Sequence, residues 1–297
     1  MPTPNPLRTS AFKQVDVFTT EPLLGNPLAV VLDADGLSGG DMQRIAAWTN
    51  LSETTFVLAP TQVGADYRVR IFTPRSELPF AGHPSVGTLH ALLEAGRIEP
   101  RERMVQECAA GLLPMRIDGH GAERRIFVRA PRATMHADDA AVSAAATTAL
   151  GAPAADTRLV DNGPRWLICD LQCEAAVRSI DPDMNTVAAL CRKIPAVGVA
   201  VFGRATGTDY ALAVRAFCPA DGIPEDPVTG SANAAIGVYL QLTGQLGDIG
   251  TNYRVSQGRE IGRDGFVDVC IDTSTGDVEI GGHSVTCVDG TLMLPHV

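Results

Sequence analysis

The chain has 297 residues, 45% of them hydrophobic and 20% charged, which is enough for a packed core in one large domain or two modest ones. Its 34 acidic residues outnumber its 24 lysines and arginines and give a net charge of -10. This charge argues against a nucleic-acid or anionic-membrane partner. No apolar run reaches the length of a membrane span, and the start lacks the apolar stretch of a secretory signal. We therefore expect a cytoplasmic protein with small-molecule partners.

The seven cysteines are dispersed and form no C-x-x-C pair. An odd, scattered set fits reduced thiols and not a disulfide framework. Cys169 and Cys173 lack a matching histidine pair downstream, so no metal site is predicted.

Two stretches share one pattern, ELPFAGHPSVGTLHALLEAG from Glu77 to Gly96 and EDPVTGSANAAIGVYLQLTG from Glu225 to Gly244. In each, a glutamate stands five residues before a glycine, Gly82 or Gly230, and an apolar run ends on another glycine fourteen residues later. The short β-prone runs VRIF and VRAF precede them, and each is closed by a proline within three residues. The pattern predicts two copies of a strand, a glycine turn and a buried helix.

The residues after the two glycines, His83 and Ser231, are predicted as helix N-caps, with Pro84 at the first helical position. A buried helix that starts at a glycine turn presents free N–H groups and a positive dipole end. We therefore expect each helix start to favour an anion, such as a carboxylate.

The repeat extends beyond these turns, because the segment starting at Asp41-Met42 resembles the one starting at Asp183-Met184. Eleven residues after the two methionines stand Glu53 and Pro195, so the carboxylate belongs to the first copy alone. A duplicated scaffold with unduplicated polar residues predicts an asymmetric active site. The period is about half the chain, which indicates two similar lobes.

Short strands separated by glycine turns, each group with one buried helix, favour an α+β class over a doubly wound one. Residues 140–151 are predicted as a helix ending on glycine. The predicted domains are residues 1–125, with Glu53 and His83, and residues 126–297, with Asp226 and Ser231. The prediction leaves open that the C-terminal strand crosses back to the first lobe.

Taken together, these motifs resemble those of the PhzF-type isomerases of phenazine biosynthesis, which share the two-lobed diaminopimelate-epimerase fold. The resemblance rests on VDVFTTEPLLGNPLAVVL, NLSETTFV, ELPFAGHPSVG, EDPVTGSANAA, SQGREIGR and GGHSV, and it covers nearly the whole chain. It implies two pseudo-symmetric lobes, each a mostly antiparallel β-sheet wrapped around a central α-helix, with the active site in the cleft between them. It also implies a homodimer and neither cofactor nor metal.

Carried over by motif, the resemblance implies catalytic roles for Glu53, as acid/base, and for His83 and Asp226. It implies substrate binding by Ser231 and by the backbone N–H groups of the turns at Gly82 and Gly230. The implied reaction moves a proton between two carbons of a small carboxylate-bearing substrate, trans-2,3-dihydro-3-hydroxyanthranilate in the phenazine enzymes. A carboxylate shielded from water can have its pKa raised enough to take and return such a proton.

Two other functions stay open. The first is an epimerase or racemase of a small amino or hydroxy acid, with Glu53 and Asp226 on opposite faces of the substrate. The second is a small-molecule-binding protein without turnover. The epimerase and racemase relatives place a cysteine at each helix start, where this chain has Ala81 and Thr229, so racemisation by two thiols is disfavoured. The isomerase is the favoured prediction.

Overall fold

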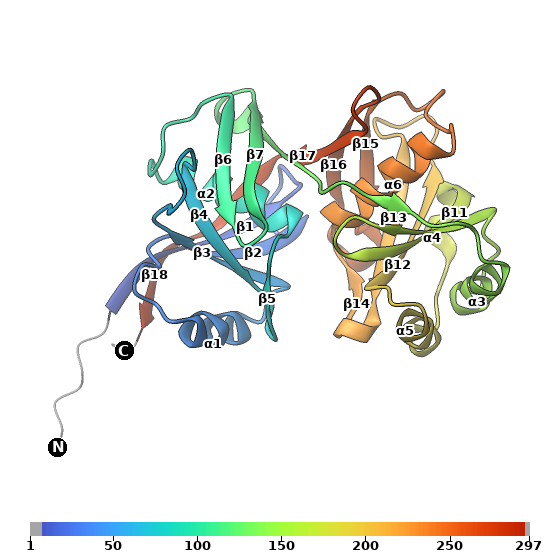
Figure 1. Cartoon of the computed structure of the whole chain (residues 1–297), viewed down its shortest axis with the longest axis horizontal. Coiled ribbons are helices and arrows are strands. Elements are labelled where there is room, and N and C mark those ends of the chain that lie inside the picture. The colour runs from blue at the N-terminus through green and yellow to red at the C-terminus, as the bar shows by residue number, and fades with distance from the viewer. Residues whose placement is uncertain (1–7, 295–297) are drawn as a thin grey trace, which may run out of the picture. The chain divides into compact units, whose positions relative to one another are not determined.

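The computed structural model describes residues 8–294 (Figure 1). These residues form two compact units. The first comprises the described residues through Val128 and those from Gly282 onward, and the second runs from Arg129 to Gly281.

The first unit has one outer helix, α1, and one central helix, α2, among its strands. Its elements in chain order are β1 (Arg8–Val17), β2 (Asn26–Val31), α1 (Gly39–Thr49), β3 (Glu53–Leu58), β4 (Tyr67–Phe72), β5 (Glu77–Leu78), α2 (Gly82–Glu94), β6 (Arg103–Cys108), β7 (Gly111–Asp118), β8 (Arg125–Arg129) and, from the end of the chain, β18 (Ser284–Leu294).

The second unit has the same kind of plan with two added helices, α3 and α4. Its elements are β9 (Thr134–Met135), α3 (Ala140–Leu150), β10 (Asp156–Asp161), β11 (Arg165–Cys173), α4 (Glu174–Ser179), α5 (Met184–Lys193), β12 (Gly198–Arg204), β13 (Leu212–Cys218), β14 (Ile223–Asp226), α6 (Gly230–Leu242), β15 (Asn252–Gln257), β16 (Gly265–Asp272) and β17 (Asp277–Gly282). The predicted helix at residues 140–151 is α3, which ends on Gly151 in the left-handed conformation.

The strands of the two units are joined in the same order. In the first unit β1 to β4 pair in sequence, β4 also pairs with β5 and β6, and β6 to β8 pair in sequence. In the second, β10 to β17 repeat these pairings. Only β2–β3 and β4–β6, with their counterparts β11–β12 and β13–β15, are parallel among these pairs. The predicted α+β class with mostly antiparallel sheets is confirmed.

The last strand, β18, belongs to the first unit. It pairs antiparallel with β1, from Val17 opposite Ser284 to Arg8 opposite Leu294. Residues at the far end of the sequence therefore complete the sheet that residues near its start begin.

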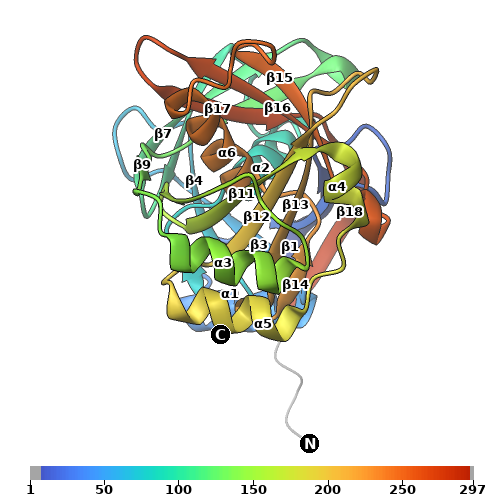
Figure 2. The ribbon, with the colours of Figure 1, turned by 90° about the vertical axis from the view of Figure 1, so that its right-hand side faces the viewer.

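Each unit buries one helix, because the helix is apolar on nearly every side. In the first unit α2 buries residues 82–89 and 91–93 and lies within the strands (Figure 1). In the second, α6 packs against β11 and β16 (Figure 2). Small side chains permit this approach, since a Cβ added at Gly87 would lie 2.7 Å from both Leu28 Cδ2 and Val17 Cγ2.

The outer helices differ between the units. In the second unit α3 lies beside α5 (Figure 2), and Leu150 of α3 shares a buried cluster with Val187 and Leu190 of α5. In the first unit α1 buries Met42 and Ile45 against the sheet. Counting from the matched methionines, Leu190 corresponds to Trp48, which is 74% exposed.

An ion pair is duplicated with the fold. In the first unit Arg70 donates to both carboxylate oxygens of Glu77 at 2.7 Å, and in the second Arg215 donates to both oxygens of Glu225 at 2.9 and 2.8 Å. The side chains of the first pair are 34% and 36% exposed, those of the second 8% and 7%. Each pair ties β4 or β13 to the short strand before the central helix.

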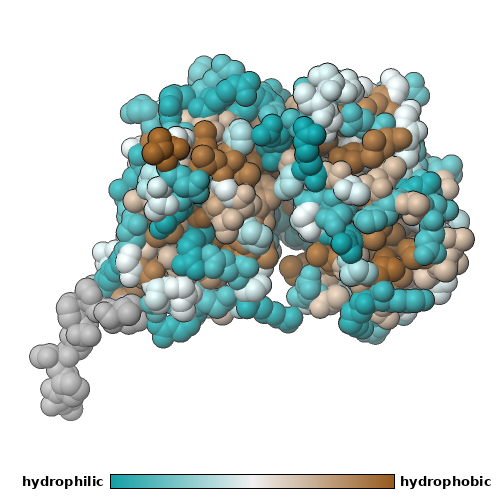
Figure 3. All heavy atoms as spheres, viewed as in Figure 1, coloured by the Kyte–Doolittle hydropathy of each residue, from teal (hydrophilic) through white to brown (hydrophobic). Residues whose placement is uncertain are grey.

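The surface mixes polar and apolar side chains, as the face drawn in Figure 3 shows. The seven cysteines are all unbridged. No helix between Arg8 and Leu294 has the length and apolar character needed to cross a membrane.

Candidate active site

Glu53 and His83 meet in the first unit. Glu53 is the first residue of β3 and pairs with Leu28 of β2, while His83 is the second residue of α2. Glu53 Oε2 lies 3.3 Å from His83 Nε2, and the two side chains are 15% and 7% exposed. The fold thus brings together a carboxylate and an imidazole that are thirty residues apart in the sequence.

Burial decides the charge of the histidine. It lowers the pKa of His83 from 6.5 to about 3, so the imidazole is neutral near pH 7. A neutral imidazole has one N–H donor and one acceptor nitrogen. Within the described residues His83 Nε2 has no hydrogen bond of good geometry, which leaves that nitrogen available for proton exchange at a contact distance from a carboxylate.

The starts of the two central helices differ from the prediction. The helices begin at Gly82 and Gly230, with Ala81 and Thr229 as N-caps, and neither cap residue accepts a hydrogen bond from the helix N–H groups through its side chain. The predicted N-cap roles of His83 and Ser231, and of Pro84 at the first position, are wrong by two residues. Capping rules assume that a side chain satisfies the first N–H groups, whereas here no side-chain cap occupies the helix start.

The backbone conformation of the two glycines bears on what the helix starts can bind. Gly82 and Gly230 are absent from the glycines with positive φ, so they do not serve a left-handed turn. Both are buried. A glycine in ordinary helical conformation leaves the backbone N–H accessible from the side where a Cβ would stand. Together with the positive end of the helix dipole, these N–H groups favour a negatively charged group at the start of each helix.

In the second unit a chain of buried hydrogen bonds holds Asp226. Gln257 Nε2 donates to Thr229 Oγ1 at 2.9 Å and to the Asp226 carbonyl at 3.1 Å. Thr229 Oγ1 in turn donates to Asp226 Oδ2 at 2.5 Å. Gln257 Oε1 accepts from the Thr229 backbone N–H and from Asn233 Nδ2. The amides of Gln257 and Asn233 are buried, and through Thr229 Oγ1 this network reaches one oxygen of the Asp226 carboxylate.

Ser231 has a different partner, an indole. Trp166 Nε1 donates to Ser231 Oγ at 3.1 Å, and Asn162 Nδ2 donates to the Ser231 carbonyl at 2.9 Å. Trp166 belongs to β11 and is 3% exposed. Its ring lies over Gly198, where an added Cβ would be 2.6 Å from Trp166 Cζ3 and 2.5 Å from the Phe217 carbonyl oxygen.

Strand pairing corrects the predicted counterpart of Glu53. Thr54 lies opposite Phe72 in the first unit and Val199 lies opposite Phe217 in the second. Since Phe72 and Phe217 correspond in the repeat, Glu53 corresponds to Gly198 and not to Pro195. The error came from counting through the helix-to-strand connection, which is longer in the second unit. The carboxylate still belongs to the first unit alone.

Four residues of this arrangement were not predicted from the sequence: Thr229, Gln257, Asn162 and Trp166. Gln257 lies in the motif SQGREIGR, which carried part of the family resemblance, so a signal was present. Trp166 and Asn162 had none, because they come from sequence positions more than sixty residues before Ser231.

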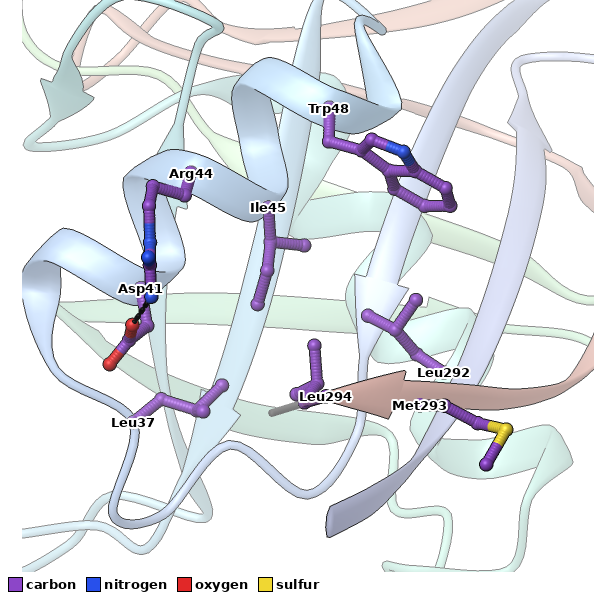
Figure 4. A pocket seen from close by; sticks show the side chains of 8 residues that line it. All are labelled: Leu37, Asp41, Arg44, Ile45, Trp48, Leu292, Met293 and Leu294. Carbon is purple, nitrogen blue, oxygen red and sulfur yellow. Dashed lines mark hydrogen bonds and ion pairs between the residues drawn. The ribbon is translucent and has the colours of Figure 1, made fainter. Parts of the chain in front are cut away.

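A groove of about 310 Å³ in the first unit holds none of the predicted site residues. It lies between α1 and the end of β18 (Figure 4) and is lined by Leu37, Asp41, Arg44, Ile45, Trp48, Leu292, Met293 and Leu294. Among residues 8–294 no helix covers Trp48, whereas in the second unit Leu190 shares a buried cluster with Leu150 of α3. Among residues 8–294 no group of three or more acidic, histidine or cysteine side chains is placed to hold a metal ion.

Comparison with known proteins extends these observations. The model of the PhzC-PhzF family, described as phenazine biosynthesis-like protein, matches residues 15–290. The chain is 38% identical to Antisense-enhancing sequence 1 of Schizosaccharomyces pombe, over 94% of this chain and 97% of that one. It is also 38% identical to trans-2,3-dihydro-3-hydroxyanthranilate isomerase of Pseudomonas aeruginosa, over 84% and 86%.

A solved structure agrees with the fold. The PhzF-family phenazine biosynthesis protein of Bacillus anthracis superposes with a TM-score of 0.84 at 28% identity, over 97% of this chain and all of that one. A family match over most of the chain, relatives that are isomerases and this structural agreement lead to one conclusion: the chain belongs to the PhzC-PhzF family of phenazine biosynthesis-like isomerases.

Proposed function

We propose that this protein moves a proton between two carbons of a small carboxylate-bearing substrate, with trans-2,3-dihydro-3-hydroxyanthranilate as the first candidate. The observation that supports this most is the contact between Glu53 Oε2 and His83 Nε2 at 3.3 Å, with both side chains largely shielded from water. The candidate substrate is the compound after which the Pseudomonas aeruginosa relative is named.

In the proposed reaction Glu53 is the base. Its carboxylate takes a proton from a substrate carbon, and the electron pair of that C–H bond moves into the conjugated system of the substrate. The same proton, held by Glu53 or passed to the neighbouring nitrogen of His83, then returns to a second carbon. No atom is gained or lost, and no redox step occurs. A general acid and base in this position contributes about 10²- to 10⁴-fold to the rate.

We propose the remaining roles as the sequence predicted them. Asp226 acts as a further catalytic residue, and Ser231 with the backbone N–H groups at Gly82 and Gly230 binds the substrate carboxylate. Donors aimed at developing negative charge stabilise such a transition state. The two units, close to the predicted 1–125 and 126–297, are the lobes of the enzyme in this proposal.

The test is proton NMR in deuterium oxide with trans-2,3-dihydro-3-hydroxyanthranilate. We compare wild type, Glu53→Gln, which keeps the shape and removes the base, and Glu77→Gln, a matched change at a glutamate outside the proposed site. Conversion by wild type and Glu77→Gln, with a loss of at least about 100-fold in Glu53→Gln, is the expected result. Equal rates for Glu53→Gln and wild type would contradict the role of Glu53.

The same spectra separate the alternatives. Inversion at a stereocentre would indicate an epimerase, and binding without exchange would indicate a protein that does not turn the compound over. If wild type leaves the compound unchanged, the assay moves to a panel of small amino and hydroxy acids and the phenazine substrate is rejected.

We further propose a cytoplasmic homodimer. Free cysteines fit a reducing compartment, and the dimer rests on the family resemblance. Light scattering after gel filtration measures the mass of the particle, and a value equal to the 31.3 kDa of one chain would reject the dimer.

A further inference from the structure

The side chains that contact the second residue of each central helix are chemically different. In the first unit the residue is His83 and its contact is Glu53 of β3. In the second it is Ser231 and its contact is Trp166 of β11. The strand position that carries Glu53 in the first unit carries Gly198 in the second, and the indole of Trp166 crosses that glycine.

This replacement changes what the second unit can do with a proton. A carboxylate and an imidazole can both accept and donate one, whereas an indole N–H is a donor only. A proton therefore cannot be relayed from Ser231 to Trp166. The second unit lacks, at this position, the acid/base function that the first unit has.

The indole also fixes the direction of the serine hydroxyl. Ser231 Oγ makes one hydrogen bond in the described part of the chain, and there it is the acceptor from Trp166. A hydroxyl has two acceptor lone pairs and one donor hydrogen. Because an N–H already points at one lone pair, the O–H hydrogen must point away from the indole. Ser231 is half-buried, so this hydrogen is within reach of a ligand.

The backbone beside Ser231 has the same polarity. Thr229 provides no side-chain cap to the start of α6, and Asn162 Nδ2 donates to the Ser231 carbonyl. Asp226, the carboxylate of the network, accepts a hydrogen bond from the Thr229 hydroxyl. The group formed by Ser231 Oγ–H and the first N–H groups of α6 thus consists of donors.

With Ser231 binding the substrate carboxylate as proposed above, we propose that Trp166 is the positioning residue that directs the Ser231 O–H toward this carboxylate. The second residue of the central helix then contacts an acid/base group in the first unit and a fixed hydrogen-bond donor in the second. This inference rests on the proposed function for its substrate and on the hydrogen bond of Trp166 for its geometry.

The chain has only two tryptophans, Trp48 and Trp166, so the hydrogen bond from Trp166 to Ser231 can be followed by NMR. In protein labelled with ¹⁵N, each indole N–H gives one cross-peak, and Trp48→Phe leaves only that of Trp166. In this background, Ser231→Ala removes the acceptor and is expected to move the peak upfield in the proton dimension. Benzoate, a carboxylate with no proton to shift, is expected to move the peak when Ser231 is present and not in Ser231→Ala. An unmoved peak in Ser231→Ala, or a benzoate shift that survives it, overturns the assignment.

Kinetics test the positioning role separately. Ser231→Ala should lower kcat by about 10²-fold, as loss of one such donor does. Trp166→Phe keeps Ser231 and removes the N–H, so about a threefold to tenfold loss of kcat/KM is expected, with no effect of the exposed control Trp48→Phe. In the double variant the Trp166→Phe loss should vanish, because the hydroxyl that it orients is gone. A loss of the same size in the Ser231→Ala background would mean that Trp166 supports only the fold, and would overturn the proposal.

The two arms separate this inference from the proposed function. If wild type does not convert the phenazine compound, that substrate falls, while the NMR arm still decides whether Trp166 orients Ser231 toward a carboxylate. If turnover is normal and neither Ser231→Ala nor benzoate moves the Trp166 peak, the proposed function stands and the positioning role of Trp166 is rejected.

Discussion

The duplicated arginine–glutamate pair predicts two very different costs for one chemical change. In Glu225→Gln a bidentate carboxylate partner of Arg215 becomes an amide, and the guanidinium stays buried with an amide N–H facing its own donors. Breaking a buried pair typically costs 3–5 kcal/mol. Arg215 keeps its bond to the Ile180 carbonyl at 2.7 Å and lies 4.0 Å from Glu260. We therefore expect the low end, about 3 kcal/mol of the free energy of unfolding.

The first unit supplies the control with the same geometry. Glu77→Gln removes the matching carboxylate from Arg70, but both side chains are about one-third exposed and water replaces the lost contact. Exposed pairs contribute about 0–1 kcal/mol, so about 0.5 kcal/mol is expected. Both pairs have the same bidentate geometry. The main difference between them is therefore the burial of their side chains.

Urea unfolding at pH 7 measures both values. Each unit contains one tryptophan, Trp48 in the first and Trp166 in the second, so emission together with circular dichroism reports whether the units unfold separately. If Glu225→Gln lowers the free energy of unfolding no more than Glu77→Gln does, burial does not govern the strength of this interaction.

Three further changes test other contacts. Because burial lowers the pKa of His83 to about 3, the unfolded chain binds a proton below pH 6.5 that the folded chain does not bind. The free energy of unfolding should therefore fall as the pH is lowered from 6.5 to about 3, by up to about 1.4 kcal/mol per pH unit. In urea titrations His83→Gln should flatten this slope. Thr229→Val removes the hydroxyl that donates to Asp226 and should destabilise the protein by about 2 kcal/mol and lower kcat; unchanged kcat would show that the orientation of Asp226 does not matter. Gly198→Ala places a methyl group 2.5 Å from a carbonyl oxygen and should lower the free energy of unfolding by about 2–3 kcal/mol. Gly247→Ala, which has open space around the added methyl group, should not lower it. Equal melting temperatures for the two variants would contradict this packing effect.

The parts of the fold that follow from local patterns were predictable. Glycine turns, apolar runs and β-prone segments placed α2, α3 and α6 within a few residues, and the repeat indicated two similar units. The grouping of Glu53 with His83 came from the family motif, because nothing in the thirty residues between them indicates that β3 and the start of α2 converge. The course of β18 along β1 was left open, since pairing at a separation of nearly the whole chain has no local signal.

The failures have physical causes that are visible in the structure. The helix starts were misplaced because Ala81 and Thr229 occupy the N-cap without capping, which a rule based on side-chain preference cannot anticipate. The counterpart of Glu53 was misplaced because the connection between a helix and a strand differs in length between the two units, whereas the register of the paired strands is the same. Aligning from the paired strands, Thr54 with Phe72 and Val199 with Phe217, gives the correct residue.

The correct counterpart changes the meaning of the asymmetry. If Pro195 were the residue equivalent to Glu53, the second unit would simply lack a carboxylate at this position. Instead the equivalent strand position is Gly198, and the space above it is filled by the ring of Trp166, whose N–H reaches Ser231. A glutamate at this position would have to occupy the volume of the indole, so the two arrangements exclude each other in one unit. A duplicated scaffold can therefore hold the base in one copy and a fixed donor in the other, but not both in the same copy, and the reaction proposed here needs one of each.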